Sequence, residues 1–272
     1  MFEGKQRTYK YEDMRPQEIL DAMEEKSIAY IAVGPLEWHG PAMPFGTDPV
    51  AAYETAVAVQ KRVGGVVLPA IYAGTERERD TDTLKSMGFN GDEYVIGQDF
   101  PKNSLCSFYM REEVFSLVIR EYLRHLTNQG FKLIVIMNGH GATNQKYTLE
   151  RLATEFSRET SSKVIVVMGV GSIGPDDAFE GHATKSETAV QMYINSDNVD
   201  LSKLPPKEIK LKNCDWGITG ATAYALTPNE DHTIEEQCDP RNATVEIGEK
   251  YMLSAIELMV AEVEKAWEEL RL

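Results

Sequence analysis

The sequence of this 272-residue chain predicts an α/β fold in which helices cover both faces of a sheet. Three observations lead to this prediction. Segments with helical spacing of apolar residues alternate with short apolar runs, the runs are rich in β-branched residues, and glycines often separate the two. Fully apolar runs of this kind are typical of strands that are buried on both faces in a parallel sheet.

The first half of the chain shows the helix–strand alternation twice. We expect helices and strands in turn at residues 15–25, 28–33, 49–63 and 66–71. Gly64 and Gly65 end the second helix. The polar stretch from Gly74 to Leu105 that follows has weak periodicity and is longer than most connections within compact domains. Such a segment is often a lid or a contact between subunits.

The second half continues the alternation. We expect helices at 112–129, 147–161, 186–194 and 244–270, and strands at 132–137 and 163–170. The run KLIVIM, at 132–137, is the least ambiguous buried strand, and Gly130 ends the helix before it. Residues 201–239 are expected to be mostly irregular.

The charge and composition disfavour several classes of function. With 43 acidic against 28 basic residues the chain carries a net charge of −15, so it would repel nucleic acid and an anionic membrane, whereas a small neutral or cationic substrate stays open. Three widely spaced cysteines support neither a disulfide framework nor a Cys-type zinc motif. The first fourteen residues lack the apolar core of a signal peptide, and no stretch approaches the roughly 18 apolar residues of a membrane helix. We therefore expect a cytoplasmic protein.

Metal-ligating side chains follow two of the predicted strands. The stretch AVGPLEWHGPAMPFGTD places Glu37, His39 and Asp48 after the first strand. Glu37 and His39 are two residues apart, so extended backbone directs both side chains to one face, and the Gly- and Pro-rich loop can bring Asp48 beside them. His140 follows KLIVIM between two glycines. Because functional groups gather at the carboxyl ends of strands in open α/β sheets, we expect a shared site there.

A third loop, EGHATKSET, offers Glu180, His182 and Glu187. Glu187 is placed to open a helix, where the free N–H groups and the helix dipole favour a carboxylate. It could therefore cap the helix, coordinate a metal or act as a base.

The other candidate residues also have purely structural interpretations. Glu37 and His39 could be a surface pair, and Asp48 could be a helix N-cap. His140 could be a turn histidine, or part of a loop that cradles phosphate at a helix N-terminus. A structural role is also open for His182.

Three motifs, in this order, resemble those of the creatininase, or creatinine amidohydrolase, family. They are EWHG with the following Asp48, NGHG with Asn144, and GHATKSET. GITGATAYA and ATVEIGEKY add a weaker likeness to that family's C-terminal segments, so the resemblance spans nearly the whole chain. It implies a three-layer αβα sandwich with a mostly parallel sheet, formed by residues 1–272 as a single domain and assembled into homo-oligomers.

The resemblance also implies roles for six residues: metal ligation by Glu37, His39, Asp48 and His140, and catalysis by His182 and Glu187. Asp48 would be the bridge if two ions bind. One position departs from creatininase itself, which carries a carboxylate where this chain has Ala142. Either Glu187 or water then replaces the missing ligand, or only one ion binds tightly. The departure also argues against creatinine as the substrate.

The ligand types indicate the chemistry without the family. Imidazole and carboxylate suit a divalent metal, with Zn²⁺ as the first choice and Mn²⁺ or Fe²⁺ as alternatives, at one or two ions per chain. An open site of this kind lowers the pKa of bound water to about 7. We predict that metal-bound hydroxide attacks a carbonyl of a small cyclic substrate, with C–N cleavage as in the amidohydrolases.

Four alternatives to C–N cleavage stay open. The same attack on a carbonyl could open a cyclic ketone such as an oxidised inositol by C–C cleavage, or remove a formyl group. From other classes, the chain could be a non-catalytic metal-binding assembly protein or a phosphate-binding protein that uses the NGHG loop. A structural metal site is usually closed by four Cys or His ligands, unlike this carboxylate-rich set.

Overall fold

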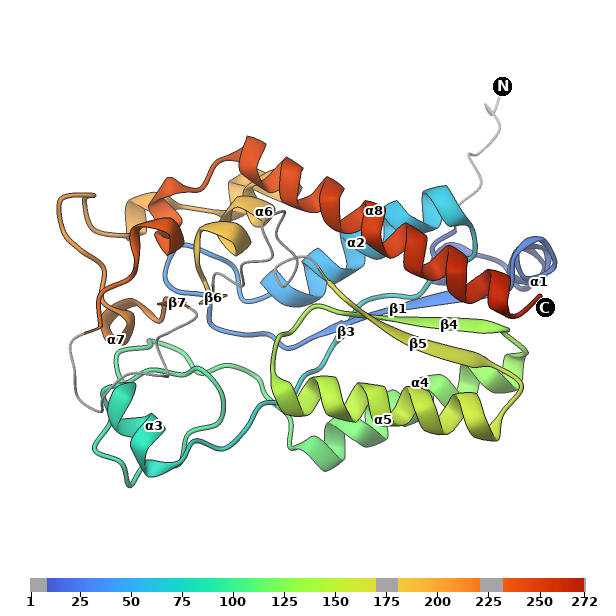
Figure 1. Cartoon of the computed structure of the whole chain (residues 1–272), viewed down its shortest axis with the longest axis horizontal. Helices are drawn as coiled ribbons and strands as arrows, with labels where there is room; N and C mark the ends of the chain where they lie inside the picture. The colour runs from blue at the N-terminus through green and yellow to red at the C-terminus, as the bar shows by residue number, and fades with distance from the viewer. Residues whose placement is uncertain (1–8, 170–180, 221–231, 272) are drawn as a thin grey trace.

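The computed structural model describes residues 9–169, 181–220 and 232–271 and has the predicted α/β architecture (Figure 1). Its centre is a parallel sheet of five strands, which are β1 (Ile28–Gly34), β2 (Val66–Val67), β3 (Ile71–Tyr72), β4 (Leu133–Asn138) and β5 (Lys163–Met168). The strand order is β2-β1-β4-β5, and β3 pairs with the carboxyl end of β1. β1 therefore has neighbours on both sides and is buried along its whole length.

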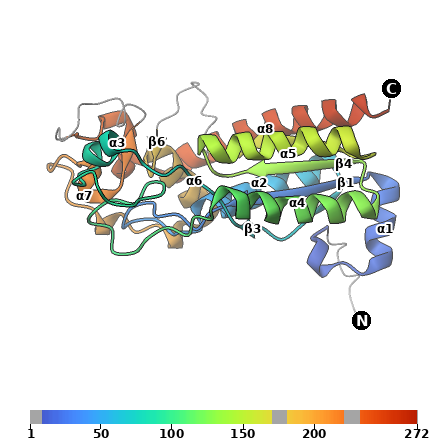
Figure 2. The same ribbon diagram turned by 90° about the horizontal axis from the view of Figure 1, so that it is seen from below.

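Helices form a layer on each face of this sheet, as the views in Figures 1 and 2 show. The long helices are α1 (Pro16–Glu25), α2 (Thr47–Val63), α4 (Glu112–Gln129), α5 (Thr143–Glu159), α6 (Lys185–Asn195) and α8 (Val245–Glu269). Short elements are α3 (Thr81–Ser86), α7 (Asn213–Trp216), the antiparallel pair β6 (Gly181–His182) and β7 (Thr219–Gly220), and 3-10 turns at Tyr11–Asp13, Ser196–Asn198, Leu201–Lys203, Glu236–Cys238 and Pro240–Asn242. Within the described residues of 201–239 only these short elements occur, so the expected irregularity is confirmed there.

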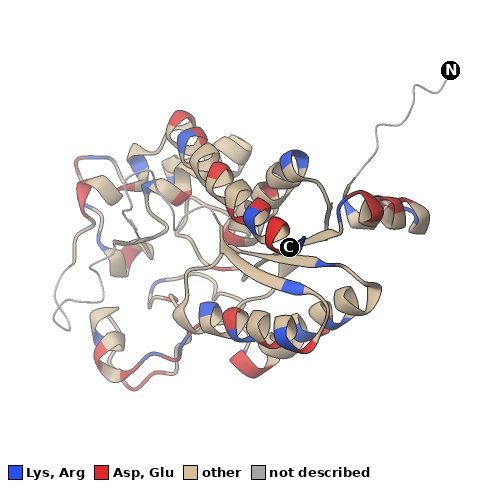
Figure 3. Ribbon diagram, turned by 45° about the vertical axis from the view of Figure 1, so that its right-hand side comes forward, with Lys and Arg blue, Asp and Glu red and all other residues tan. Residues whose placement is uncertain are grey.

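The side chains of β1 point alternately to the two faces of the sheet, and the core is divided into two halves accordingly. Ile28, Tyr30 and Ala32 pack toward α2 and α8. The intervening residues of β1 pack toward α1, α4 and α5. Since successive side chains of a strand point to opposite faces, a strand whose residues are all apolar requires a cover on both sides. Charged residues of both signs are spread along the outer helices (Figure 3).

The predicted strand at 66–71 is wrong in one respect, because the structure divides it into β2 and β3. Pro69 lies in the gap. Proline has no N–H to give to a strand ladder, which interrupts regular pairing with β1 at this point.

Two helices begin earlier than predicted. α2 begins at Thr47 with Gly46 as its N-cap, so Asp48 lies inside the first turn and is not the cap. α5 begins at Thr143, four residues before the predicted start. The side chain of Gln145 binds Asn138 and the backbone of Thr75, and these tertiary bonds fix a first turn whose residues have weak helix propensity. The predicted end of β5 at Val170 lies outside the described residues.

No helix in the described part of the chain combines the length and apolar character needed to cross a membrane.

The close approach of α2 and β1 gives a testable prediction. Gly65 has φ +95°, and an added Cβ would lie 2.5 Å from the carbonyl oxygen of Ile28. Gly130 has a similar φ of +92°, but its nearest neighbour would be 4.0 Å away. Gly130→Ala should therefore lower the free energy of unfolding by about 1 kcal/mol, from backbone strain alone. Gly65→Ala should cost about 1–3 kcal/mol more because it also overpacks.

Urea denaturation of the two variants beside the wild type measures this difference. Equal losses of stability in both variants would contradict the packing at Gly65.

Candidate metal centre

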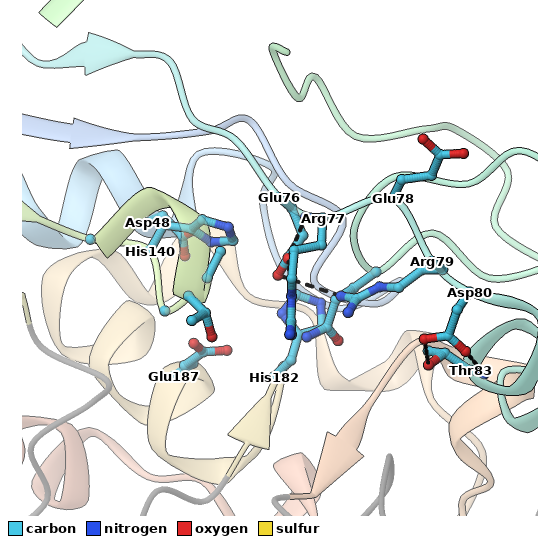
Figure 4. Close-up of a pocket in the computed structure, with 15 residues that line it drawn as sticks. Asp48, Glu76, Arg77, Glu78, Arg79, Asp80, Thr83, His140, His182 and Glu187 are labelled. Atoms are coloured by element: carbon cyan, nitrogen blue, oxygen red, sulfur yellow. Dashed lines mark hydrogen bonds and ion pairs between the residues drawn. The ribbon is translucent and has the colours of Figure 1, made fainter. Parts of the chain in front are cut away.

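The structure brings the six predicted site residues into one buried cluster at the carboxyl ends of β1 and β4. They are Glu37, His39, Asp48, His140, His182 and Glu187. The cluster opens into a cavity of about 370 Å³, which Figure 4 shows with Asp48, His140, His182 and Glu187 at its base. Glu180, the further acidic residue of the third loop, lies outside the described residues.

The loop after β1 is held by backbone contacts and not by extended strand geometry. β1 ends at Gly34, and the Glu37 N–H donates to the carbonyl of Phe45 at 2.9 Å. Nδ1–H of His39 donates to the carbonyl of Glu37 at 3.0 Å. The predicted convergence of Glu37 and His39 is therefore produced by this folded loop.

Glycines allow close contact between the end of β1, the NGHG turn and the first turn of α2. A Cβ on Gly139 would lie 2.2 Å from the backbone oxygen of Asp48, and one on Gly34 would lie 2.8 Å from the Asp48 Cβ. The side chain of Asn138 bonds with both the N–H and the carbonyl of His140. The NGHG turn thus lies directly on the first turn of α2.

Glu37, Asp48 and His140 form a first group of metal-ligating atoms. Nδ1 of His140 lies 3.0 Å from Asp48 Oδ2 and 3.0 Å from Glu37 Oε2. The other ring nitrogen of His140 is buried without a hydrogen-bond partner. An imidazole between two carboxylates is a suitable set for a divalent ion.

His39, Asp48 and Glu187 form a second group. Nε2 of His39 lies 3.1 Å from Asp48 Oδ1 and 3.6 Å from Glu187 Oε2, without hydrogen-bond geometry. Because Nδ1–H donates to the Glu37 carbonyl, Nε2 is the ring nitrogen that faces these carboxylates, where a proton or a metal ion can occupy it. Asp48 belongs to both groups, one oxygen facing each histidine.

His182 approaches the cluster from β6. Its Nε2–H donates to the carbonyl of Trp38 at 2.6 Å, which leaves Nδ1 as an acceptor directed toward the site, 3.8 Å from Glu37 Oε1. Its ring lies 4.4 Å from that of His39. The next residue, Ala183, has φ +57°, and its N–H donates to Glu187 Oε2 at 2.6 Å. This left-handed turn fixes Glu187 beside His39.

The electrostatics of the cluster favour positive charge. Burial opposes a charge on His39, but the nearby Asp48 and Glu187 carboxylates outweigh it and raise its pKa to about 10. Burial likewise opposes a charge on His140, yet Glu37 and Asp48 raise its pKa well above the usual value. Burial raises the pKa of Glu187 to about 7, and the Asp48 charge adds to this effect. Buried carboxylates in such number require a cation.

His182 differs from the other two histidines. Burial lowers its pKa to about 4 despite the charge of Glu37, so its imidazole is neutral at pH 7 and able to accept a proton. The neutral ring offers the lone pair of Nδ1 to a proton or to a metal ion, and a pKa of about 4 makes it a weaker base than a group that titrates near pH 7.

A divalent metal fits these residues. Nε2 of His39 and Nδ1 of His140 both point to carboxylates of the cluster, and Nε2 of His39 is buried without a hydrogen-bond partner. Three groups of three ligand atoms lie within 4.8 Å of one another, the two described above and a third made of Glu37, His39 and His182. Buried polar atoms are rarely left unpaired, so an ion among these lone pairs would satisfy both the bonding and the charge.

The polar segment from Gly74 to Leu105 forms the opposite wall of the cavity. Arg77 and Arg79 extend toward His182, whereas Glu78 points away (Figure 4). The nearly buried carboxylate of Glu76 lies 3.4 Å from both guanidinium groups. Trp216 is not among the described residues that line the cavity and packs against a small apolar cluster with Ile218.

Two features of the site were missed by sequence reasoning. Tyr109 donates a short hydrogen bond to Glu37 Oε1, although nothing in its surrounding sequence marks it. Arg77 and Arg79 stand in the run ERERD, whose alternation of charges was the available signal.

A family model described as creatinine amidohydrolase matches residues 12–263 of the chain. The chain belongs to the Creatininase family. Among curated proteins, no match was found.

Solved creatininase structures share the fold. A creatininase designated Mn superposes with a TM-score of 0.67 at 15% identity, over 96% of this chain and 99% of that one. A Zn–Zn form of a creatininase mutant gives 0.65 at 17% identity over the same shares. A putative creatinine amidohydrolase from Bacteroides fragilis gives 0.66 at 19% identity, over 98% and 97%. These likenesses confirm the fold class, and family membership together with the ligand groups supports a metal-dependent hydrolase.

Because Asp48 is shared by both ligand groups, its loss should disturb both. We expect Asp48→Ala to lose bound metal and hydrolytic activity together, while a control change at an exposed acidic residue, Glu150→Ala on α5, leaves both unchanged. Elemental analysis of the two purified variants measures the metal. Full metal content with normal turnover in Asp48→Ala would refute the assignment of this cluster.

Proposed function

We propose that this Creatininase-family chain is a metal-dependent hydrolase that opens a small cyclic substrate by adding water to a carbonyl carbon. Cleavage of a C–N bond in a cyclic amide is the first candidate, because the matching family model is described as creatinine amidohydrolase. The observation that carries the proposal is the position of Asp48 between two imidazole–carboxylate groups that face one cavity.

The donor set suits Zn²⁺ first and Mn²⁺ or Fe²⁺ next, with two ions when both groups are filled. Bound divalent ions supply an activated water at neutral pH and polarise the carbonyl that it attacks. Glu37 and His140 would hold one ion, His39 and Glu187 the other, and Asp48 would bridge them. Glu187 then takes the place of the carboxylate that creatininase carries at the position of Ala142.

His182 supplies proton transfer. Its Nε2–H is held by the Trp38 carbonyl, which orients Nδ1 as the acceptor. Nδ1 takes a proton from the attacking water and returns it to the leaving atom, because the same lone pair faces the place where both steps occur. The sequence-based assignment of Glu187 as a second catalytic residue is replaced in this proposal by metal ligation.

The wall of the cavity favours a second candidate substrate, a polyhydroxylated cyclic ketone such as an oxidised cyclitol. Of the described lining residues nearly all are polar, and none is Phe, Tyr or Trp. Arg77 and Arg79 offer donors beside the acceptor Glu76, a mixture that matches hydroxyl groups, which both donate and accept. A flat, apolar heterocycle would not use these polar partners, and no Phe, Tyr or Trp among the described lining residues offers it a stacking surface.

A non-catalytic assembly protein with a structural metal is less well supported. Its metal would not need a neighbouring cavity or a neutral, correctly oriented histidine at the cavity base. The homo-oligomer, the small-molecule partner and the cytoplasmic location expected from the sequence stay predictions.

The experiment that tests the function compares metal content and hydrolysis. We expect one or two equivalents of Zn, Mn or Fe per chain in the gently purified wild type and a clear loss in His140→Ala. The loaded wild type is then offered cyclic amides and cyclic polyhydroxy ketones, with the ring-opened acid followed by mass spectrometry. A ring-opened amino acid from the cyclic amide supports the first candidate, and a ring-opened acid from the ketone supports the second. A wild type that takes up no metal after addition of Zn²⁺ or Mn²⁺ would refute the proposal.

A separate prediction concerns His182. His182→Ala should keep its metal and lower kcat by about 10²–10⁴-fold, the usual contribution of a positioned acid–base group. His125→Ala, at an exposed position on α4, is the matched control and should change neither quantity. Complete loss of metal in His182→Ala would instead make His182 a ligand.

A further inference from the structure

Tyr109 contacts the centre from outside the cavity. It lies three residues before α4, and its hydroxyl donates a short hydrogen bond to Glu37 Oε1. Its ring lies 5.9 Å from that of His140. It is not among the described lining residues, so its contact is with the predicted ligand and not with a substrate in the cavity.

The bond distinguishes the two oxygens of Glu37. Oε1 accepts from Tyr109, while Oε2 lies 3.0 Å from Nδ1 of His140, within the first ligand group. A free carboxylate can rotate and exchange its oxygens, whereas a hydrogen bond to one oxygen leaves the other to face an ion. Outer groups that hold metal ligands in this way orient them and tune the affinity.

The position of Tyr109 is itself fixed by its packing. A Cβ on Gly97 would lie 2.2 Å from the ring of Tyr109, and Gly97 has φ +76°, so a glycine is needed for the ring to fit. The N–H of Gln98 donates to the Tyr109 hydroxyl oxygen at 3.4 Å. Gln98 lines the cavity, which connects the wall of the cavity to this hydroxyl.

A second set of bonds holds the same loop against the residue after Glu37. The Trp38 N–H donates to Ser107 Oγ at 2.9 Å, and Ser107 in turn donates to Asp99 from its hydroxyl at 2.8 Å and its N–H at 3.0 Å. Residues 97–109 therefore clamp Glu37 through its side chain and through the neighbouring backbone.

We propose that Tyr109 is a positioning residue that fixes Glu37 with Oε2 toward the first metal ion. The inference rests on the proposed metal-dependent function, and it concerns the geometry of one ligand and not a step of the reaction. Tyr109 acts on turnover only through the occupancy and placement of the ion.

The test is the dissociation constant for Zn²⁺, measured by chelator competition on wild type and on Tyr109→Phe. We expect the affinity to fall by about 10–100-fold, the range for loss of an outer-shell partner. KM at saturating Zn²⁺ should stay near the wild-type value, since the hydroxyl does not touch substrate. Tyr94→Phe is the matched control, because Tyr94 is an exposed tyrosine of the adjoining polar segment, and it should bind Zn²⁺ as the wild type does.

Thermal unfolding of the metal-free proteins separates positioning from a merely structural role. A lowered melting temperature in Tyr109→Phe with unchanged Zn²⁺ affinity would overturn the inference while leaving the proposed function intact. If the wild type itself binds no Zn²⁺, the proposed function fails, and the role of Tyr109 fails with it.

Discussion

The gathering of three carboxylates, Asp48 among them, in a largely buried site is the constraint on which the rest of the site depends. Glu37, Asp48 and Glu187 lie among histidines whose ring nitrogens are partly unpaired, and such an arrangement is stable only with positive charge among them. The carboxylates therefore raise the pKa values of His39 and His140, because a protonated ring supplies the positive charge. A divalent ion meets the same demand without needing a protonated ring, which is why the cluster suits a metal centre.

The parallel sheet makes this concentration of charge accessible from one side. β1 and β4 run in register, with Val33 opposite Asn138, so the loops that follow them leave at the same edge. Gly139 then allows the NGHG turn to contact the Asp48 backbone directly. The base of the site is therefore built from the loop after β1, the NGHG turn after β4 and the first turn of α2, whereas its outer wall, between Gly74 and Leu105, comes from a longer connection. That division is typical of enzymes in which a scaffold holds the reacting groups and a loop selects the substrate.

The base of the cavity bears on the chemistry of the site, and the wall bears on the substrate. The base holds the histidines and carboxylates of the ligand groups, and the shared fold at 15–19% identity says nothing about the substrate. In the wall, Glu76 forms ion pairs with Arg77 and Arg79. Beside Ala142, which is not a ligand, Glu187 is the carboxylate that lies next to His39.

Hydrophobic periodicity by itself determined the fold class, because a run such as KLIVIM can be satisfied only by burial on both faces. The motifs after those runs also identified all six residues that converge in the cluster. Only the tertiary structure decided which atoms face each other, since Asp48 reaches both histidines through the first turn of α2 rather than as a cap. It alone revealed Tyr109 and the early start of α5, because each depends on a contact between residues distant in sequence, Tyr109 with Glu37 and Gln145 with Thr75. The spacing of apolar residues along the sequence indicates which face of a helix or strand is buried. The partner of a hydrogen bond between distant residues is fixed only when the chain has folded.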